Sequence, residues 1–360
     1  MKIELIFAIF ALVGALDKIT GNRFKLGDEF DKGVMSTGPL ILAMSGMIVL
    51  APVIASGLSL VFGPLLNLLH IDLSILAAFF PVDSGGASMA HELSDDIAIS
   101  GYNGIVVASM FGAALCPGIP ISLQIVEKEY HEDVLIGLLC GFATIPFGCI
   151  ISGIMLGIGA VELILNTLLI IVISFIICLG LWKCPRLSGK IFGILGKVLM
   201  VFITVGLVVG IFHQLTDFEI MKNTVPITDS FIIIGNIAII LAGVFPLLTI
   251  ISRVFNKYFL RLGNALKLDN MSVMGLVTIL ANYIPVFSMI KDMNKKGRIM
   301  NMAFCVSAAF ILGDHLAFVL AFDRAFVLPM VIGKSISGVL SLVMATIVYN
   351  RMEKNKKTFS

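Results

Sequence analysis

The stretch "FFPVDSGGASMAHEL" (Phe79 to Leu93) places a proline, an aspartate and two adjacent glycines inside a run that is otherwise apolar. A carboxylate such as that of Asp83 is costly in hydrocarbon, so it usually faces a cavity or a partner there. Proline and glycine both interrupt helices. The stretch is therefore either an imperfect spanning helix or the tip of a hairpin, and the rest of the chain decides between the two.

The composition is that of a polytopic membrane protein. The chain has 360 residues, of which 58% are hydrophobic and 13% charged, and its mean hydropathy is +1.05. Apolar runs of roughly 17 to 25 residues, the length that crosses a bilayer as helix, follow one another with short polar gaps. No room is left for a soluble catalytic or nucleotide-binding domain. The net charge of +2 comes with basic clusters beside apolar runs, which indicate topology rather than nucleic-acid binding.

Motifs of enzymes and metal sites are missing from the sequence. The six cysteines form no C-x-x-C pair, so neither a disulfide framework nor a zinc site is expected. There is no phosphate-binding G-x-x-x-x-G-K-[ST] and no H-E-x-x-H. We therefore expect no cofactor, no metal and no enzymatic activity.

Loop charges decide the topology. The apolar segments lie at about 3–17, 36–66, 71–90, 102–126, 134–157, 161–182, 191–213, 228–252, 270–290, 299–322 and 325–349. If all of them span, the loop Lys and Arg residues divide 11 to 13 between the two sides, which violates the positive-inside rule. If 71–90 and 270–290 each enter and leave on one face, they divide 3 outside to 21 inside. We therefore predict two re-entrant hairpins, an outer N-terminus and a cytoplasmic C-terminus.

The two halves also resemble each other at an offset of about 190 to 200 residues, for example "HID" at 70–72 and "KLD" at 267–269. We predict an all-α polytopic membrane protein with about nine spanning helices and two re-entrant helical hairpins in two inverted-topology repeats, a plan of many secondary transporters. The expected divisions are a first repeat at 1–157 with hairpin 71–90, a connecting helix at 158–188, a second repeat at 189–350 with hairpin 269–291, and a basic cytoplasmic tail at 351–360.

Three ionisable side chains fall near the centre of membrane segments, namely Asp83, Asp314 and Lys334. Lys334 is close enough in sequence to form an ion pair with Asp314. The first six segments offer Asp83 no basic partner, so it is interpreted as a cation site, or as an N-cap of the returning limb. Ser84, Gly85 and Gly86 complete the tip, where glycine lets a small ligand approach the backbone.

The second predicted tip, "ANYIP" at 281–285, provides an amide in Asn282 and a phenol and aromatic face in Tyr283. A simple kink at Pro285 is the alternative interpretation. His315, beside Asp314, is either a proton relay or a hydrogen-bonded structural residue. The breaks "CPGIP" at 116–120 and "GDH" at 313–315 are both expected to be unwound points facing the hairpins.

The chain resembles the bacterial ethanolamine utilisation transporter (ethanolamine permease, EutH) family from about Gly27 to Lys334. The most specific similarities are "DEFDKGVMSTGPLILAMSGMIVLAPVIA", "VDSGG" and "ILANYIPVFSMIKDMNKKGRIMNMAFCVSAAFILGDHLAF". Asp83, Asn282, Asp314 and His315 match the family's motifs, whereas Tyr283 stands where the family is expected to have a second amide, and Ala317 where it is expected to have glycine.

The resemblance implies a transporter or facilitator for uptake of protonated ethanolamine in the bacterial plasma membrane. The predicted substrate-binding residues are Asp83, Ser84, Gly85, Gly86, Asn282, Tyr283, Asp314 and His315. The expected partners are ethanolamine, the lipid bilayer and, by analogy with other hairpin-containing transporters, a second copy of the chain. A small-cation channel, or a membrane-embedded sensor or enzyme, is the alternative. The sequence leaves the driving force open.

Overall fold

The computed structural model describes residues 3–79 and 86–359, and all regular structure within them is helical. The α-helices are α1 Ile3–Ile19, α2 Leu26–Met35, α3 Thr37–Leu40, α4 Gly46–Leu68, α5 Leu76–Phe79, α6 Gly86–Leu93, α7 Ile97–Gly101, α8 Ile119–Ile125, α9 His131–Phe142, α10 Ile145–Met155, α11 Ala160–Lys183, α12 Pro185–Thr216, α13 Ile227–Leu266, α14 Asn270–Ile279, α15 Ile284–Met289, α16 Lys295–Ala308, α17 Asp314–Phe322 and α18 Val327–Phe359. Three π-helices are η1 Ile41–Ser45, η3 Tyr102–Gly112 and η4 Ala114–Gly118, and short 3₁₀ turns are η2 Leu73–Ile75, η5 Lys128–Tyr130, η6 Ile290–Asp292 and η7 Arg324–Phe326.

Six helical stretches in the described part of the chain are long and apolar enough to cross a membrane: Leu26–Leu68, Lys128–Met155, Ala160–Lys183, Arg186–Thr216, Ile227–Leu266 and Arg324–Asn355. The other three predicted spans are not single long α-helices, each for a different structural reason. The first of them, α1, has 17 residues, the second runs through π-helices η3 and η4, and the third is divided into α16 and α17. A helical membrane protein is thus confirmed, whereas the count of nine spans stays a prediction.

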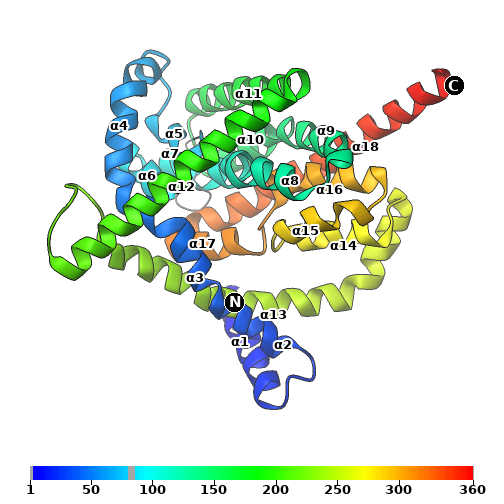
Figure 1. Cartoon of the computed structure of the whole chain (residues 1–360), viewed down its shortest axis with the longest axis horizontal. Helices are drawn as coiled ribbons and strands as arrows, with labels where there is room; N and C mark the ends of the chain where they lie inside the picture. Colours follow the sequence, from blue (N-terminus) through cyan, green and yellow to red (C-terminus); the bar gives the residue numbers. More distant parts are fainter. Residues whose placement is uncertain (1–2, 80–85, 360) are drawn as a thin grey trace.

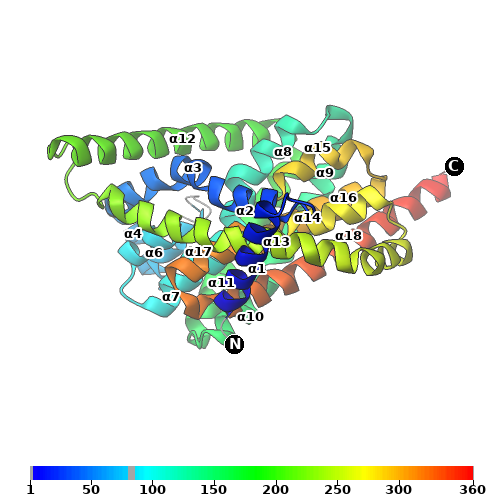
Figure 2. The same ribbon diagram turned by 90° about the horizontal axis from the view of Figure 1, so that it is seen from below.

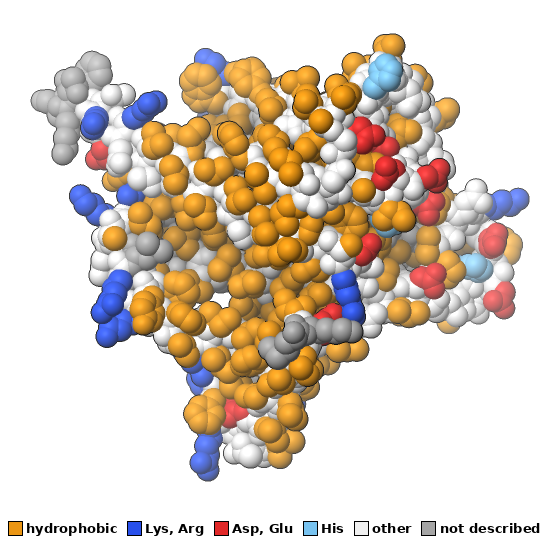
Figure 3. All heavy atoms as spheres, turned by 180° about the vertical axis from the view of Figure 1, so that it is seen from behind, with side chains coloured by type: hydrophobic (Ala, Val, Ile, Leu, Met, Phe, Trp, Pro, Cys, Tyr) orange, Lys and Arg blue, Asp and Glu red, His pale blue; other side chains and the backbone are white. Residues whose placement is uncertain are grey.

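The long helices α12 and α13 lie at the edges of the molecule, and shorter helices lie between them and the other elements. α13 runs along one edge of the molecule, and α1 and α2 pack on it (Figures 1 and 2). α12 covers another edge, against α4 and α11. The short helices α14 to α16 lie between α13 and α9, and the end of α18 projects from the body (Figure 1). Broad apolar surface covers the face in Figure 3, with most Lys and Arg side chains towards its left and lower edges and most Asp and Glu towards its right edge.

The first predicted hairpin is closed at its base by Asp72. The Asp72 carboxylate accepts hydrogen bonds from the backbone N–H of Ser74 (2.9 Å) and from the hydroxyl of Ser94 (2.8 Å). Since Ser74 precedes α5 and Ser94 follows α6, the carboxylate joins the two ends of the segment. Asn103, a buried residue on η3, donates from its amide nitrogen to the Ser74 hydroxyl (2.9 Å). The base of this segment is therefore fixed to the next helix.

The second predicted hairpin is closed in the same manner by Asp269. Its carboxylate accepts from the backbone N–H groups of Ser272 (2.8 Å) and Asn294 (2.6 Å). Asn301, buried on α16, donates to the backbone carbonyl of Ser272 (2.9 Å). The N-terminal part of α16 is thus attached to the start of α14.

The helices that lead into the two segments end alike. His70 and Lys267 both adopt the left-handed conformation, with φ of 54° and 57°. The next residue then closes the helix end: the Ile71 N–H donates to the Leu66 carbonyl (3.0 Å), and the Leu268 N–H donates to the Gly263 carbonyl (2.9 Å). This is a Schellman-type cap, which satisfies carbonyls at a helix C-terminus.

One predicted unwound point is confirmed and the other is wrong. Between α16 and α17 the chain leaves the helix at Ala309 to Gly313, and the N–H groups of Phe310 and Leu312 donate to the carbonyls of Ile279 (3.0 Å) and Leu280 (2.9 Å). The "CPGIP" stretch at 116–120, in contrast, stays helical. It passes from π-helix η4 into α8, and Pro120 lies in the first turn of α8, where the missing N–H of a proline breaks no helical hydrogen bond.

Candidate functional site

The charged side chain of Lys334 on α18 is fully buried, with 0% of its surface exposed. Its Nζ lies 2.6 Å from the backbone carbonyl oxygen of Ser109 on η3 and 2.8 Å from Nδ1 of His315 on α17. When Lys334 is an ammonium it can only donate, and Nδ1 of His315 is then the acceptor. Lys334 therefore joins α17 to η3 in the interior of the protein.

A chain of aromatic contacts continues from His315 to the second predicted hairpin. The His315 ring, 1% exposed, lies 4.9 Å from the ring of Phe310, which lies 4.8 Å from that of Tyr283. Tyr283 also packs against Phe287 at 5.0 Å, and its hydroxyl donates to the Ala113 carbonyl (3.4 Å). The predicted site residues Tyr283 and His315, which come from different elements, are therefore connected through the ring of Phe310.

Helix η3 lies at the centre of these contacts. Eleven consecutive residues, Tyr102–Gly112, are π-helical and buried; π-helical turns are rare and frequently occur at functional sites. The carbonyls of Ser109 in this π-helix and of Ala113 beyond it receive the hydrogen bonds from Lys334 and Tyr283. The sequence prediction included neither carbonyl, because no side-chain pattern identifies a π-helix in this small-residue stretch.

Asp83, Ser84 and Gly85 lie outside the described residues, and their predicted roles stay predictions. The residues on either side of them pack on η3: the Phe79 ring contacts that of Phe111 at 5.2 Å. Gly86, buried at the start of α6, leaves little space, since a Cβ there would lie 3.0 Å from the Ala77 carbonyl oxygen. Both neighbours of the predicted tip thus rest on the helix that contacts Lys334.

Asn282 and Asp314 lie at the edges of the same region. The Asn282 side-chain oxygen accepts from the backbone N–H of Ile284 (2.8 Å), so it supports the turn, as the kink interpretation requires. Its amide nitrogen makes no hydrogen bond in the described part of the chain and can donate to a ligand. Asp314 is the first residue of α17, where a helix N-terminus stabilises negative charge. The predicted ion pair between Asp314 and Lys334 stays a prediction.

An apolar cavity of about 160 Å³ adjoins the broken helix, that is, α16 and α17 with the non-helical residues between them. It is bounded by Phe7 of α1, Leu247 and Leu248 of α13, and Leu312 and Leu316 on either side of Asp314.

No group of three His, Cys, Asp or Glu side chains in residues 3–79 and 86–359 is placed to hold a metal ion.

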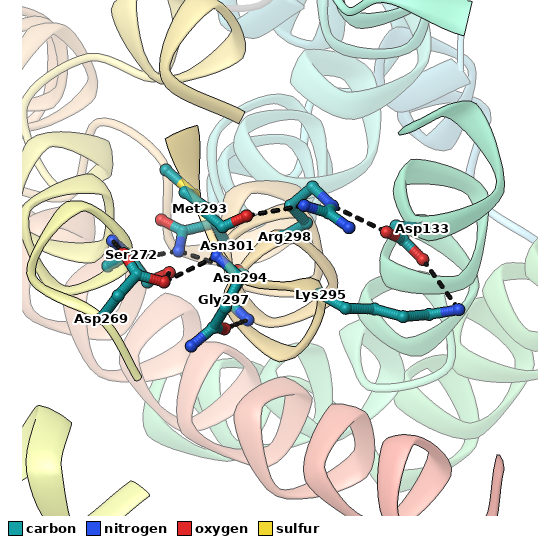
Figure 4. A network of polar contacts seen from close by, with 9 residues as sticks. All are labelled: Asp133, Asp269, Ser272, Met293, Asn294, Lys295, Gly297, Arg298 and Asn301. Carbon is teal, nitrogen blue, oxygen red and sulfur yellow. Dashed lines mark hydrogen bonds and ion pairs between the residues drawn. The ribbon is translucent and has the colours of Figure 1, made fainter. Parts of the chain in front are cut away.

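A second polar network joins the base of the second predicted hairpin to α9 (Figure 4). Asp133, with 7% of its side chain exposed, lies 2.7 Å from Nε of Arg298 and 3.5 Å from Nζ of Lys295. Arg298 also donates to the Met293 carbonyl (2.6 Å) and lies over the Tyr130 ring at 4.5 Å. The sequence prediction missed this network because Asp133 and Arg298 are 165 residues apart.

Comparison with known proteins assigns the family. The family model described as "Ethanolamine utilisation protein, EutH" matches residues 2–348. A protein of Listeria monocytogenes named "Probable ethanolamine permease EutH" is 40% identical over 98% of this chain and 95% of its own length. A protein of the same name from Escherichia coli is 33% identical over 94% and 93%, and the "Uncharacterized protein YxeR" of Bacillus subtilis is 35% identical over 94% and 92%. No solved structure matches. The permease names agree with the expectation of a transporter rather than an enzyme, and the chain belongs to the EutH family of ethanolamine utilisation proteins.

Proposed function

We propose that this protein carries protonated ethanolamine across the bacterial plasma membrane, and that the substrate binds between the two hairpin tips and the broken helix. Near full-length similarity to relatives named as ethanolamine permeases supports the substrate. The observation that carries the location of the site is a pair of contacts with η3 and the residue that follows it. Lys334, which also contacts His315, reaches the Ser109 carbonyl, and Tyr283 reaches the Ala113 carbonyl. Elements from both halves of the chain meet there, as in transporters that bind at the midplane.

The chemistry of the substrate fits the candidate residues. Protonated ethanolamine is a small ammonium ion with one hydroxyl, so it requires a carboxylate and a hydrogen-bonding group at short range. Asp83 supplies the main carboxylate, with Asp314 as a second one, and Ser84, Gly85 and Gly86 allow close approach to the backbone. The amide nitrogen of Asn282 donates to the substrate hydroxyl. The faces of Tyr283 and its aromatic neighbours attract the ammonium.

The proposed topology has nine spanning helices and two re-entrant hairpins, with an outer N-terminus and a cytoplasmic C-terminus. Contacts between loops support it. Glu4, at the end of the first segment that is predicted to be outer, and Arg324, in a loop predicted outside, form an ion pair at 3.1 Å. Lys296 donates to the Leu266 carbonyl (2.7 Å), which joins two loops predicted inside. Cysteines introduced at 94–100 should react with an impermeant reagent from outside and those at 292–297 only from inside; reaction of both from one face would contradict the inverted repeats.

Uptake of labelled ethanolamine into proteoliposomes tests the proposed site. Asp83→Asn should raise the half-saturating ethanolamine concentration about tenfold or more, because a hydrogen bond to a charged group is worth about 1.5 to 3 kcal/mol. Asp95→Asn, an exposed change in the predicted outer loop, is the matched control and should transport normally. An unchanged concentration dependence for Asp83→Asn would remove Asp83 from the site.

The same assay separates the alternatives. A small-cation channel would give a flux that does not saturate with ethanolamine, and a sensor or enzyme would bind or convert it without net flux. Imposed proton or sodium gradients would distinguish facilitated diffusion from coupled transport. We include a homodimer in the proposal by analogy with other hairpin-containing transporters, and sedimentation of the detergent-solubilised protein tests it.

A further inference from the structure

An apolar groove runs along one face of the second hairpin. A cavity of about 150 Å³ is lined by Val273, Leu276, Val277 and Leu280, which face Phe304 of α16 and Leu342 of α18. The first four residues have the spacing i, i+3, i+4 and i+7, so they share one face of α14 and its C-terminal cap. Seven residues of helix rise about 10 Å. The apolar lining therefore extends about 10 Å along the hairpin limb.

Basic side chains stand at one end of this groove. Leu266 and Leu268, which also line it, lie on either side of Lys267. The Nζ of Lys296 donates to the Leu266 carbonyl (2.7 Å) and the residue is only 9% exposed. Burial lowers the pKa of Lys296, and the charge of the neighbouring Lys267 lowers it further. Two ammonium groups therefore lie close together at the rim.

These two charges lack an acidic counterpart in the described part of the chain. The ion pairs described involve other basic residues. Lys296 has three N–H donors, of which the carbonyl of Leu266 receives one. Lys267 is exposed, and its side chain makes no described hydrogen bond. An anion at the rim would neutralise both lysines and accept their remaining donors.

We propose that the groove binds an anionic phospholipid of the cytoplasmic leaflet, with one acyl chain along α14 and the phosphate on Lys267 and Lys296. An apolar cavity of this size has no polar groups to retain water, and an acyl chain is the apolar material that a membrane supplies. The negatively charged headgroup matches the two lysines, since juxtamembrane basic residues attract anionic lipids. The leaflet rests on the proposed topology, whereas the acyl chain and phosphate contacts do not.

Thermal unfolding of the delipidated protein in detergent tests the proposal. Added phosphatidylglycerol should raise the melting temperature by about 3 °C or more above the effect of phosphatidylcholine, because a ligand that binds the native state stabilises it. Inorganic phosphate alone should have no effect. An equal effect of the two lipids would overturn the role of the lysines, and a full effect of phosphate alone would show an anion site without a lipid.

Two variants separate the headgroup from the chain. Lys267→Met should abolish most of the difference between the two lipids, whereas Lys190→Met, an exposed lysine on α12, should leave it unchanged. Val277→Phe should fill the groove and reduce retention of phosphatidylglycerol at least about fivefold by native mass spectrometry. Retention at the parental level in Val277→Phe, or an unchanged lipid difference in Lys267→Met, would refute the proposal. None of these readouts depends on ethanolamine transport.

Discussion

The bases of the two predicted hairpins have similar hydrogen bonds but differ in how they are attached to the rest of the protein. Asp72 and Asp269 lie at the start of the two segments, and each accepts a hydrogen bond from a residue just beyond the end of its segment. A buried asparagine, Asn103 or Asn301, then attaches each base to the next helix. Within residues 3–79 and 86–359, the second base alone adds an ion pair to a distant helix, that of Arg298 with Asp133. Each predicted hairpin therefore has a closed loop at its base that is attached to a helix, and the two bases differ in how firmly that helix is held.

The position of the extra ion pair explains the difference. With the offset of 198 residues between Asn103 and Asn301, the position of Arg298 corresponds to that of Ser100 at the first base. Ser100 is buried and donates to the backbone carbonyl of Ile97 (3.3 Å), so its hydroxyl is satisfied within its own helix. We infer that the second base is the more rigid of the two, and that the first opens at a lower cost in free energy.

Loss of the Asp133 carboxylate should have the largest effect on this comparison. Asp133→Asn leaves Arg298 and Lys295 without their counter-charge, and breaking a largely buried ion pair costs about 3 kcal/mol. The melting temperature in detergent should fall by about 5 °C or more. Glu132→Gln, at the exposed neighbouring position, is the control. Equal melting temperatures for Asp133→Asn and Glu132→Gln would show that the ion pair does not hold the second base.

Substitution of the two base aspartates gives an intermediate effect. Asp269→Asn should destabilise by about 2 kcal/mol and Asp72→Asn by about 1 kcal/mol. The reason is that Asp269 accepts from two backbone N–H groups, which cannot reorient, whereas two of the three donors to Asp72 are hydroxyls, which can turn to water.

Chemical unfolding curves of the two variants in one detergent measure that difference. Asp292→Asn and Asp95→Asn, which change exposed aspartates near the respective bases, serve as matched controls. A larger cost for Asp72→Asn than for Asp269→Asn would reverse the inferred order of rigidity.

Removal of the two asparagines should give the smallest difference. Asn301 donates two hydrogen bonds, to the carbonyls of Ser272 and Gly297, whereas Asn103 donates one. Asn301→Ala should therefore cost about 1 kcal/mol more than Asn103→Ala, again measured by chemical unfolding. Asn67→Ala, at an exposed position near the end of α4, controls for the loss of an amide. Identical costs at 103 and 301 would make the two attachments equivalent.

The sequence predicted the elements that depend on local chemistry. The break at "ANYIP" lies between α14 and α15, and the break before Asp314 separates α16 from α17, since proline and glycine act through their own backbones. The correspondence of "HID" with "KLD" is supported by the shared left-handed residues His70 and Lys267. The same reasoning was wrong at "CPGIP", because the chain stays helical there and passes from π-helix η4 directly into α8.

The candidate site was less accessible to such reasoning. Composition indicated Asp314, His315 and Lys334, because ionisable residues in apolar segments are conspicuous. The contact of Lys334 with the Ser109 carbonyl joins residues 225 positions apart. Because the acceptor is a backbone carbonyl, the pattern of side chains in the sequence could not predict this contact. The aromatic path through Phe310 depends on that residue having a φ of 60°, which an aromatic residue rarely adopts.

The apolar cavity beside the broken helix determines how the protein responds to hydrostatic pressure. Its volume of about 160 Å³ corresponds to about 100 mL per mole, a size that makes a conformational equilibrium sensitive to pressure. Any movement of α17 that collapses the space beside Leu312 and Leu316 is favoured under hydrostatic pressure, and any movement that widens it is opposed. The sign of the pressure effect on uptake would thus report whether the broken helix closes or opens this space in the slowest step of transport.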